Sequence, residues 1–226
     1  MITIGIDPHK ASHTAVALDE GGRLLGELRV VATKAMLERL LRWAERWPER
    51  IWAVEGATGL GHLLAQQLVA HRETVLDVPA TLAARARLLA RGHGRKTDAI
   101  DAASVAKVAQ SQPGLRRVGA EDHSAVLRLL SDRRDELTQA RRTVVNRLHR
   151  LLRDLHPGGA PTELSSEVAG RLLGRIRPAN VVDLERKAMA RALIVDLRRI
   201  DRNLVESRRR CAAAVLASGT TLTSVF

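Results

Sequence analysis

The chain of 226 residues has little of what disulfide-bonded, thiolate-ligated or aromatic sites are made from. Its single cysteine, Cys211, excludes an internal disulfide and a cysteine-based metal site. Aromatic residues make up 2% of the chain and tyrosine is absent, which disfavours nucleobase stacking on aromatic side chains. No apolar run approaches the roughly 18 residues needed to span a bilayer, and no signal peptide is visible. We therefore expect a cytoplasmic protein without a membrane partner.

Acidic residues are scarce relative to basic ones. The 25 Asp and Glu residues stand against 37 Lys and Arg residues, which gives a formal net charge of +12. Such an excess indicates a polyanionic partner, either a nucleic acid or an anionic membrane surface. We favour nucleic acid and expect a nucleoid-associated protein. Because aromatic residues are few, arginine contacts to phosphates and to helix shape are the expected mode of binding.

The first half of the chain combines strand and helix signals. Apolar and β-rich runs separated by turn residues predict three consecutive strands, and helices then alternate with two further strands. The order βββ-α-β-α-β-α predicts a mixed sheet flanked by helices, which is the arrangement of the ribonuclease-H-like (RuvC-like) α/β fold. The predicted strands are 2–7, 13–18, 23–31, 51–55 and 74–78, and the predicted helices are 34–47, 63–71, 79–90 and 98–110.

The second half of the chain is predicted to be helical. After Pro113 there is no strand signal, and residues 124–155 carry apolar side chains at spacings of three, four and seven. Helices at 163–175 and 182–216 complete a helical hairpin or coiled-coil arm. The apolar stripe on its first helix also suggests an interface between copies of the chain. We expect domains at 1–115 and 120–218, with 219–226 beginning a further C-terminal domain.

Four acidic residues stand where a carboxylate is locally unexpected. Asp7 and Glu55 each end an apolar strand, whereas Asp98 and Asp101 open a helix and share one of its faces. Carboxylates that converge from such positions repel one another unless cations lie between them. Oxygen ligands favour Mg²⁺ or Mn²⁺, and a pair of these ions is suited to cleaving phosphodiester bonds. We therefore predict that these four residues are metal ligands and catalytic residues.

Each acid also has a simpler interpretation. Asp7 could cap a turn, and Glu55 could pair with an arginine at the edge of the core. Asp98 and Asp101 could be acids that favour a helix N-terminus. The joint pattern favours a site, because the two strands would be neighbours and a basic loop precedes the helical acids.

Three motifs contain these acids: Gly5-Ile6-Asp7-Pro8-His9-Lys10, Val54-Glu55-Gly56-Ala57-Thr58-Gly59 and Gly94-Arg95-Lys96-Thr97-Asp98-Ala99-Ile100-Asp101-Ala102. With these motifs the chain resembles the DEDD transposases of insertion sequences, of the IS-one-ten type and related to the Piv-like DNA invertases. The third motif is the most specific. The resemblance implies that the four acids form the metal-binding set of a RuvC-like domain.

The resemblance also implies partners and a missing part. DNA is the implied substrate, and a structured non-coding RNA encoded by the element is an implied partner. Dimers or tetramers are implied, with the helical arm as their interface. Members of the family continue into a second domain that supplies a nucleophilic serine, and this chain stops where that domain would begin. Two alternatives stay open: a RuvC-like junction resolvase or nuclease, and a non-catalytic nucleic-acid-binding fragment.

Basic residues near the acids and on the helical arm are candidates for contact with nucleic acid. Arginine on a long helix is usually only a solvated face, but the excess of cations favours phosphate contact for some of them. The candidates are Lys10, Arg91, Arg95, Lys96, Arg141, Arg142 and Arg147.

Overall fold

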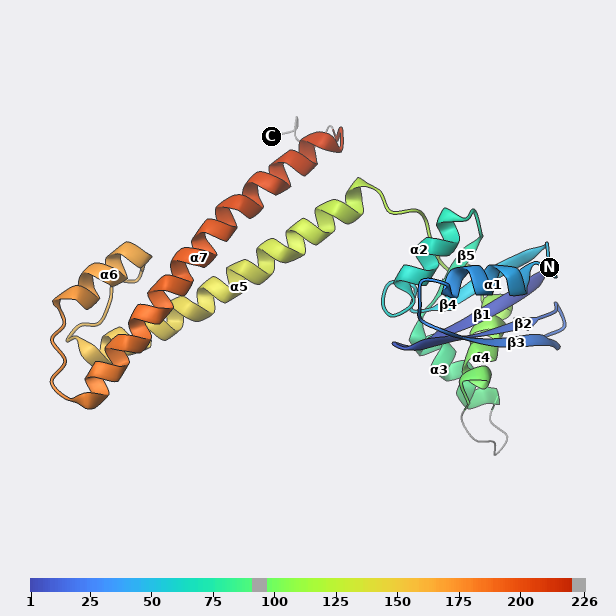
Figure 1. The fold of residues 1–226 in the computed structure, drawn as a ribbon, viewed down its shortest axis with the longest axis horizontal. Coiled ribbons are helices and arrows are strands. Elements are labelled where there is room, and N and C mark those ends of the chain that lie inside the picture. Colours follow the sequence, from blue (N-terminus) through green and yellow to red (C-terminus); the bar gives the residue numbers. More distant parts are fainter. Residues whose placement is uncertain (91–96, 221–226) are drawn as a thin grey trace. The chain divides into compact units, whose positions relative to one another are not determined.

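The computed structural model describes residues 1–90 and 97–220 (Figure 1). The chain divides into two compact units, Met1–Glu121 and Asp122–Phe226, called here the sheet unit and the helical unit. Each unit has its own hydrophobic core, so each is described separately.

The sheet unit is built on five strands in the order β3-β2-β1-β4-β5. The first three strands are antiparallel neighbours, whereas β4 and β5 join β1 in parallel. This mixed sheet, flanked by helices, is the predicted ribonuclease-H-like fold, and the prediction is confirmed. The strands are β1 (Ile2–Pro8), β2 (Ser12–Leu18), β3 (Leu24–Val31), β4 (Arg50–Glu55) and β5 (Val75–Val78).

Helices cover both faces of the sheet (Figure 1). Alternate residues of a strand point to opposite faces, so the apolar strands β1, β2 and β4 supply a core on each side. One core contains Ile4, Ile6 and Trp52 and packs against α1 (Met36–Ala44) and α2 (His62–Ala70). On the other face lie α3 (Ala80–Ala90) and α4 (Asp98–Ser111).

Residues after α4 remain part of the sheet unit. The backbone of Asp77 donates a hydrogen bond to the carbonyl of Arg116, and that of Val118 donates to Val75. The side chain of Val118 lies in the core beneath α1 and α2. The sheet unit therefore extends to Glu121, six residues beyond the expected limit of 115.

The helical unit is a hairpin of two long helices with a short helix between them. α5 (His123–Leu155) and α7 (Val181–Ala217) lie side by side and antiparallel, and α6 (Ser166–Arg175) packs against α7 (Figure 1). Asp122 and Asn180 cap α5 and α7 by accepting backbone hydrogen bonds, as helix N-termini require. Within residues 1–90 and 97–220, no helix is both long and apolar enough to cross a membrane.

The closest packing in the sheet unit is predicted to tolerate no side chain at Gly5. A Cβ at this position would lie 2.1 Å from the carbonyl oxygen of Ala102 and 2.6 Å from the nitrogen of Ala106, both backbone atoms of α4. Gly5→Ala should therefore lower the free energy of unfolding by about 3 kcal/mol. Urea denaturation followed by tryptophan fluorescence measures this unit alone, because the three tryptophans lie at positions 43, 47 and 52.

Gly119→Ala is the matched control, since a Cβ there meets no atom within 4 Å. Equal stability of the two variants would contradict the close contact between β1 and α4.

Candidate active site

Two of the four acids meet at the ends of neighbouring parallel strands. Ile6 of β1 is in register with Val54 of β4, so the next residues, Asp7 and Glu55, lie side by side at the sheet edge. Only 6% of Asp7 is exposed, and the side chain of Glu55 is 13% exposed. Both carboxylates are thus largely removed from water.

The other two acids reach the same edge from α4. Thr97 caps this helix by accepting a hydrogen bond from the nitrogen of Ile100 at 3.3 Å, as its position before the motif predicts. The helix lies directly on β1 and β2, and Asp101 is 3% exposed while Asp98 is more accessible. The electrostatic influence of Glu55, Asp98 and Asp101 on Asp7 shows that all four acids face one another; we call them the acid cluster.

Three cationic or ionisable side chains contact the acid cluster. Arg87 of α3 places Nη1 3.4 Å from Oε2 of Glu55 and Nε 3.7 Å from Oδ1 of Asp101. His9 lies between two acids, with Nδ1 3.5 Å from Oδ2 of Asp7 and Nε2 3.9 Å from Oδ1 of Asp98. Arg29 of β3 also reaches Asp98, with 3.5 Å between its Nη1 and Oδ2.

Burial and like charge make Asp7 harder to ionise. Burial raises the pKa of the Asp7 carboxyl to about 6; His9 opposes this, while Glu55, Asp101 and Asp98 add to the increase. Burial also raises the pKa of Glu55, against the lowering effect of Arg87. A carboxylate held ionised against such opposition is a common feature of functional sites.

The acid cluster fits a divalent cation. Asp7 Oδ2 is buried and accepts no hydrogen bond from any of the described residues, so its charge lacks the donors that normally satisfy a buried carboxylate. Ligand atoms of Asp7, His9 and Asp98 lie within 4.8 Å of one another. Such a set of oxygens with one imidazole suits Mn²⁺ or Mg²⁺.

The acids open onto a cleft of about 390 Å³, whose lining includes Asp7, Glu55, Asp101 and Arg87. A second hollow of about 530 Å³ shares His9 and Leu60 with this cleft, and we call it the strand groove. Its lining includes Lys10, His13, Lys34, Leu63 and Gln67.

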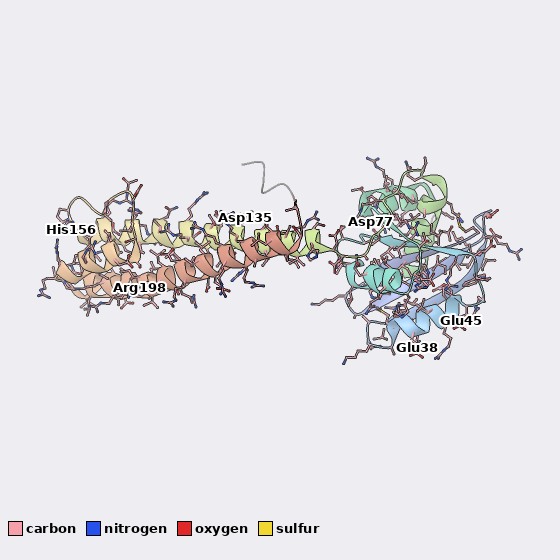
Figure 2. The ribbon with its side chains drawn as sticks, turned by 90° about the horizontal axis from the view of Figure 1, so that it is seen from above. Glu38, Glu45, Asp77, Asp135, His156 and Arg198 are labelled. Carbon is pink, nitrogen blue, oxygen red and sulfur yellow. The ribbon has the colours of Figure 1, made fainter. Side chains whose placement is uncertain are left out.

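Asp77 shows that an acid near this edge need not belong to the acid cluster. This β5 residue (Figure 2) accepts a hydrogen bond from the nitrogen of Ala57 and pairs with Arg116, each at 2.9 Å. These bonds hold the loop that follows Glu55. Asp77 therefore shapes the cleft without lining it.

The basic residues predicted to bind nucleic acid lie in different places. Lys10 lines the strand groove, whereas Arg141 pairs with Asp201 at 2.7 Å within the helical unit. Arg142 and Arg147 are exposed on α5. Arg91, Arg95 and Lys96 lie outside the described residues.

Sequence reasoning did not identify Arg87 or Arg29 as part of the site. Nothing in the local sequence distinguishes Arg87 from Arg85, two residues earlier on the same helix. His9 was noticed only as the residue after Asp7-Pro8, and its contact with Asp98 needs α4 in place.

Comparison with known proteins identifies the class to which this fold and site belong. A sequence model of the DEDD transposases of the IS110 type, described as "Transposase", matches residues 4–157. This match covers more than half of the chain, including all four acids. The chain therefore belongs to this transposase family, and the resemblance seen in the sequence is confirmed.

Two curated relatives come from insertion elements. The uncharacterised 44.8 kDa protein of insertion element IS116 from Streptomyces clavuligerus is 34% identical over 157 residues, which are 69% of this chain and 39% of the relative. The uncharacterised 42 kDa protein of IS900 from Mycobacterium paratuberculosis is 33% identical over 141 residues, 61% of this chain and 35% of the relative. The chain thus matches less than half of the length of these relatives.

Among solved structures, two of RuvC from Thermus thermophilus are similar to the sheet unit. One is in complex with a Holliday junction substrate and covers 52% of this chain and 99% of its own, with 18% identity and a TM-score of 0.41. The other has the same identity and a TM-score of 0.40.

The raised pKa of Asp7 predicts that its charge destabilises the sheet unit when no metal is bound. The folded protein binds this proton more tightly than the unfolded chain, so the destabilisation is full above pH 6. It disappears as the pH falls from about 6 toward the ordinary value of 3.8. With chelator present, Asp7→Asn should raise the free energy of unfolding at pH 8 by about 1–3 kcal/mol, and much less at pH 4.5.

Urea denaturation with tryptophan fluorescence at both pH values measures this difference. Glu45→Gln is the control, because Glu45 is an exposed acid on the same unit (Figure 2). A variant no more stable than wild type at pH 8 would show that the Asp7 charge is already compensated.

Proposed function

We propose that this chain is the RuvC-like part of a DNA transposase that acts on DNA phosphodiester bonds with Mg²⁺ or Mn²⁺. The observation that carries the proposal is the gathering of four carboxylates from β1, β4 and α4 at one sheet edge. Asp7 Oδ2, buried there without a hydrogen bond from the described residues, supports a cation as the missing partner. Membership of the transposase family supplies the class of reaction.

The residues have distinct tasks in this proposal. Asp7, Glu55, Asp98 and Asp101 would hold the metal, which when bound supplies positive charge to the attacking and leaving oxygens of a phosphodiester. Low exposure of Asp7 and Asp101 keeps water away from their carboxylates and strengthens their attraction for cations. His9 contributes an imidazole between Asp7 and Asp98.

The strand groove gives the DNA a place beside the acids. Lys10 and Lys34 supply exposed cations for backbone phosphates, and Leu60 and Leu63 present exposed apolar side chains. His13 and Gln67 also line this groove, and each has a buried polar atom that lacks a hydrogen bond from the described residues. A groove with these properties suits a nucleotide strand better than an uncharged ligand.

A structured RNA and other copies of the chain are proposed partners of the helical unit. Exposed Arg142 and Arg147 are available to phosphates, since neither has an ion pair within the described part of the chain. The apolar stripe expected to join copies is largely used within the hairpin, because Leu148 and Leu151 pack in the core with α7. A dimer or tetramer would therefore use other side chains, such as exposed Leu129, Val195 and Val205.

A junction resolvase or nuclease is the second candidate function. One observation favours it: all four acids lie in the sheet unit, so the metal site does not need residues from a further domain. Cleavage of branched DNA by this chain alone, without strand transfer, would distinguish this candidate from the transposase.

Metal binding is the first prediction of the proposed function. Isothermal titration of Mg²⁺ and Mn²⁺ into the full chain should show binding that Asp7→Asn and Asp98→Asn each weaken about tenfold or more, because each removes an oxygen ligand. Asp135→Asn is the control, since Asp135 is an exposed acid of the helical unit (Figure 2). Unchanged affinity in both site variants would rule out a shared metal site.

The strand groove predicts a salt-sensitive contact with DNA. In fluorescence anisotropy with a labelled oligonucleotide, the double variant Lys10→Gln and Lys34→Gln should bind more weakly. The slope of log affinity against log salt should become shallower by about 1–2, because each lost phosphate contact releases fewer counterions. Lys107→Gln is the control, as this exposed lysine of α4 lines neither hollow. A slope equal to that of wild type would place the DNA elsewhere.

A further inference from the structure

Arg87 occupies a position between two of the proposed metal ligands. Its guanidinium contacts Glu55 through Nη1 at 3.4 Å and Asp101 through Nε at 3.7 Å. The side chain is only 20% exposed, so this contact is partly shielded from water. One guanidinium thus joins carboxylates that come from β4 and α4.

This contact divides the acid cluster into two halves. Asp7 and Asp98 face His9, and these three residues bring ligand atoms within 4.8 Å of one another. Glu55 and Asp101 do not belong to that close group among the described residues, and both face Arg87 instead. The cation that lies between these two acids is therefore part of the protein.

We propose that Arg87 is a built-in competitor of the metal, which holds Glu55 and Asp101 when no divalent ion is bound and has to leave them before both can become ligands. The inference rests on the proposed metal-dependent function. Arg87 acts through the carboxylates, so its role is that of a positioning residue.

Electrostatics explains why a competitor is useful. Without a cation, the buried carboxylates would repel one another, and Arg87 reduces this repulsion; its charge and hydrogen bond also act to lower the pKa of Glu55. A divalent ion attracts the same oxygens more strongly, but the ion and the guanidinium repel each other at close range. Metal binding therefore includes the free energy of moving Arg87 away.

A permanent structural ion pair would make the opposite prediction. If Arg87 only tied α3 to β4 and α4, its loss would loosen Glu55 and Asp101 and weaken metal binding. A competitor, in contrast, lowers metal affinity while it is present. The sign of the change in affinity separates the two roles.

The test is isothermal titration of Mg²⁺ and Mn²⁺ into the full chain at pH 8. Arg87→Gln should bind metal about tenfold more tightly than wild type, a gain of about 1.4 kcal/mol. Arg87→Lys keeps the charge and should stay close to wild type. Arg85→Gln is the matched control, because Arg85 is an exposed arginine on the same helix.

Thermal unfolding followed by tryptophan fluorescence gives a second readout. With chelator, Arg87→Gln should melt below wild type because the carboxylates repel; with saturating Mg²⁺, its melting temperature should rise by more than that of wild type. Arg87→Met keeps the apolar stem and removes the charge, so it replaces Arg87→Gln if that variant does not fold.

Each outcome decides between the two proposals. Equal or weaker affinity in the folded, charge-free variants overturns the role of Arg87; if Asp7→Asn still abolishes wild-type binding, the metal-dependent function stands. Absence of metal binding in wild type and in every Arg87 variant overturns both. Binding in Arg87→Gln but not in wild type would support the competitor most strongly.

Discussion

The arrangement of the acid cluster depends on the close contact between α4 and β1. Gly5 leaves the backbone of β1 bare where Ala102 and Ala106 of α4 lie against it, and a single methyl group there would overlap the helix backbone. This contact sets how deeply Asp101 is buried and how near it comes to Asp7, two residues beyond Gly5. A packing constraint in the core therefore positions the charges at the surface of the sheet.

Charge at this edge is balanced in parts. Asp7 carries most of the cost of burial, with its pKa raised to about 6, while Arg87, His9 and Arg29 each offset a share of the negative charge. Buried like charges reduce the stability of the protein, and such strain is typical of sites that await a ligand. The same physical effect explains both the attraction of the cluster for cations and the presence of cationic side chains around it.

The helical unit shows how one pattern can serve two purposes. Spacings of three, four and seven on α5 predicted both a helix and an interface between copies of the chain. In the structure, the stripe residues Leu148 and Leu151 are covered by α7 of the same chain. The pattern establishes that a face is buried, but it does not identify the partner that buries it. The groups left exposed, rather than the stripe, are the relevant ones for assembly.

The sequence by itself predicted the order of elements, the ribonuclease-H-like sheet and the transposase family, because strand and helix periodicity and the motifs around Asp7, Glu55 and Asp98 are local signals. It also predicted that the four acids converge, since strands that end in parallel share an edge. Only the tertiary structure decided which cations meet them. Arg87 and Arg85 look alike in sequence, and a contact with Glu55 and Asp101 depends on how α3 packs beside α4. Long-range packing of this kind leaves no periodic or local trace in a single sequence.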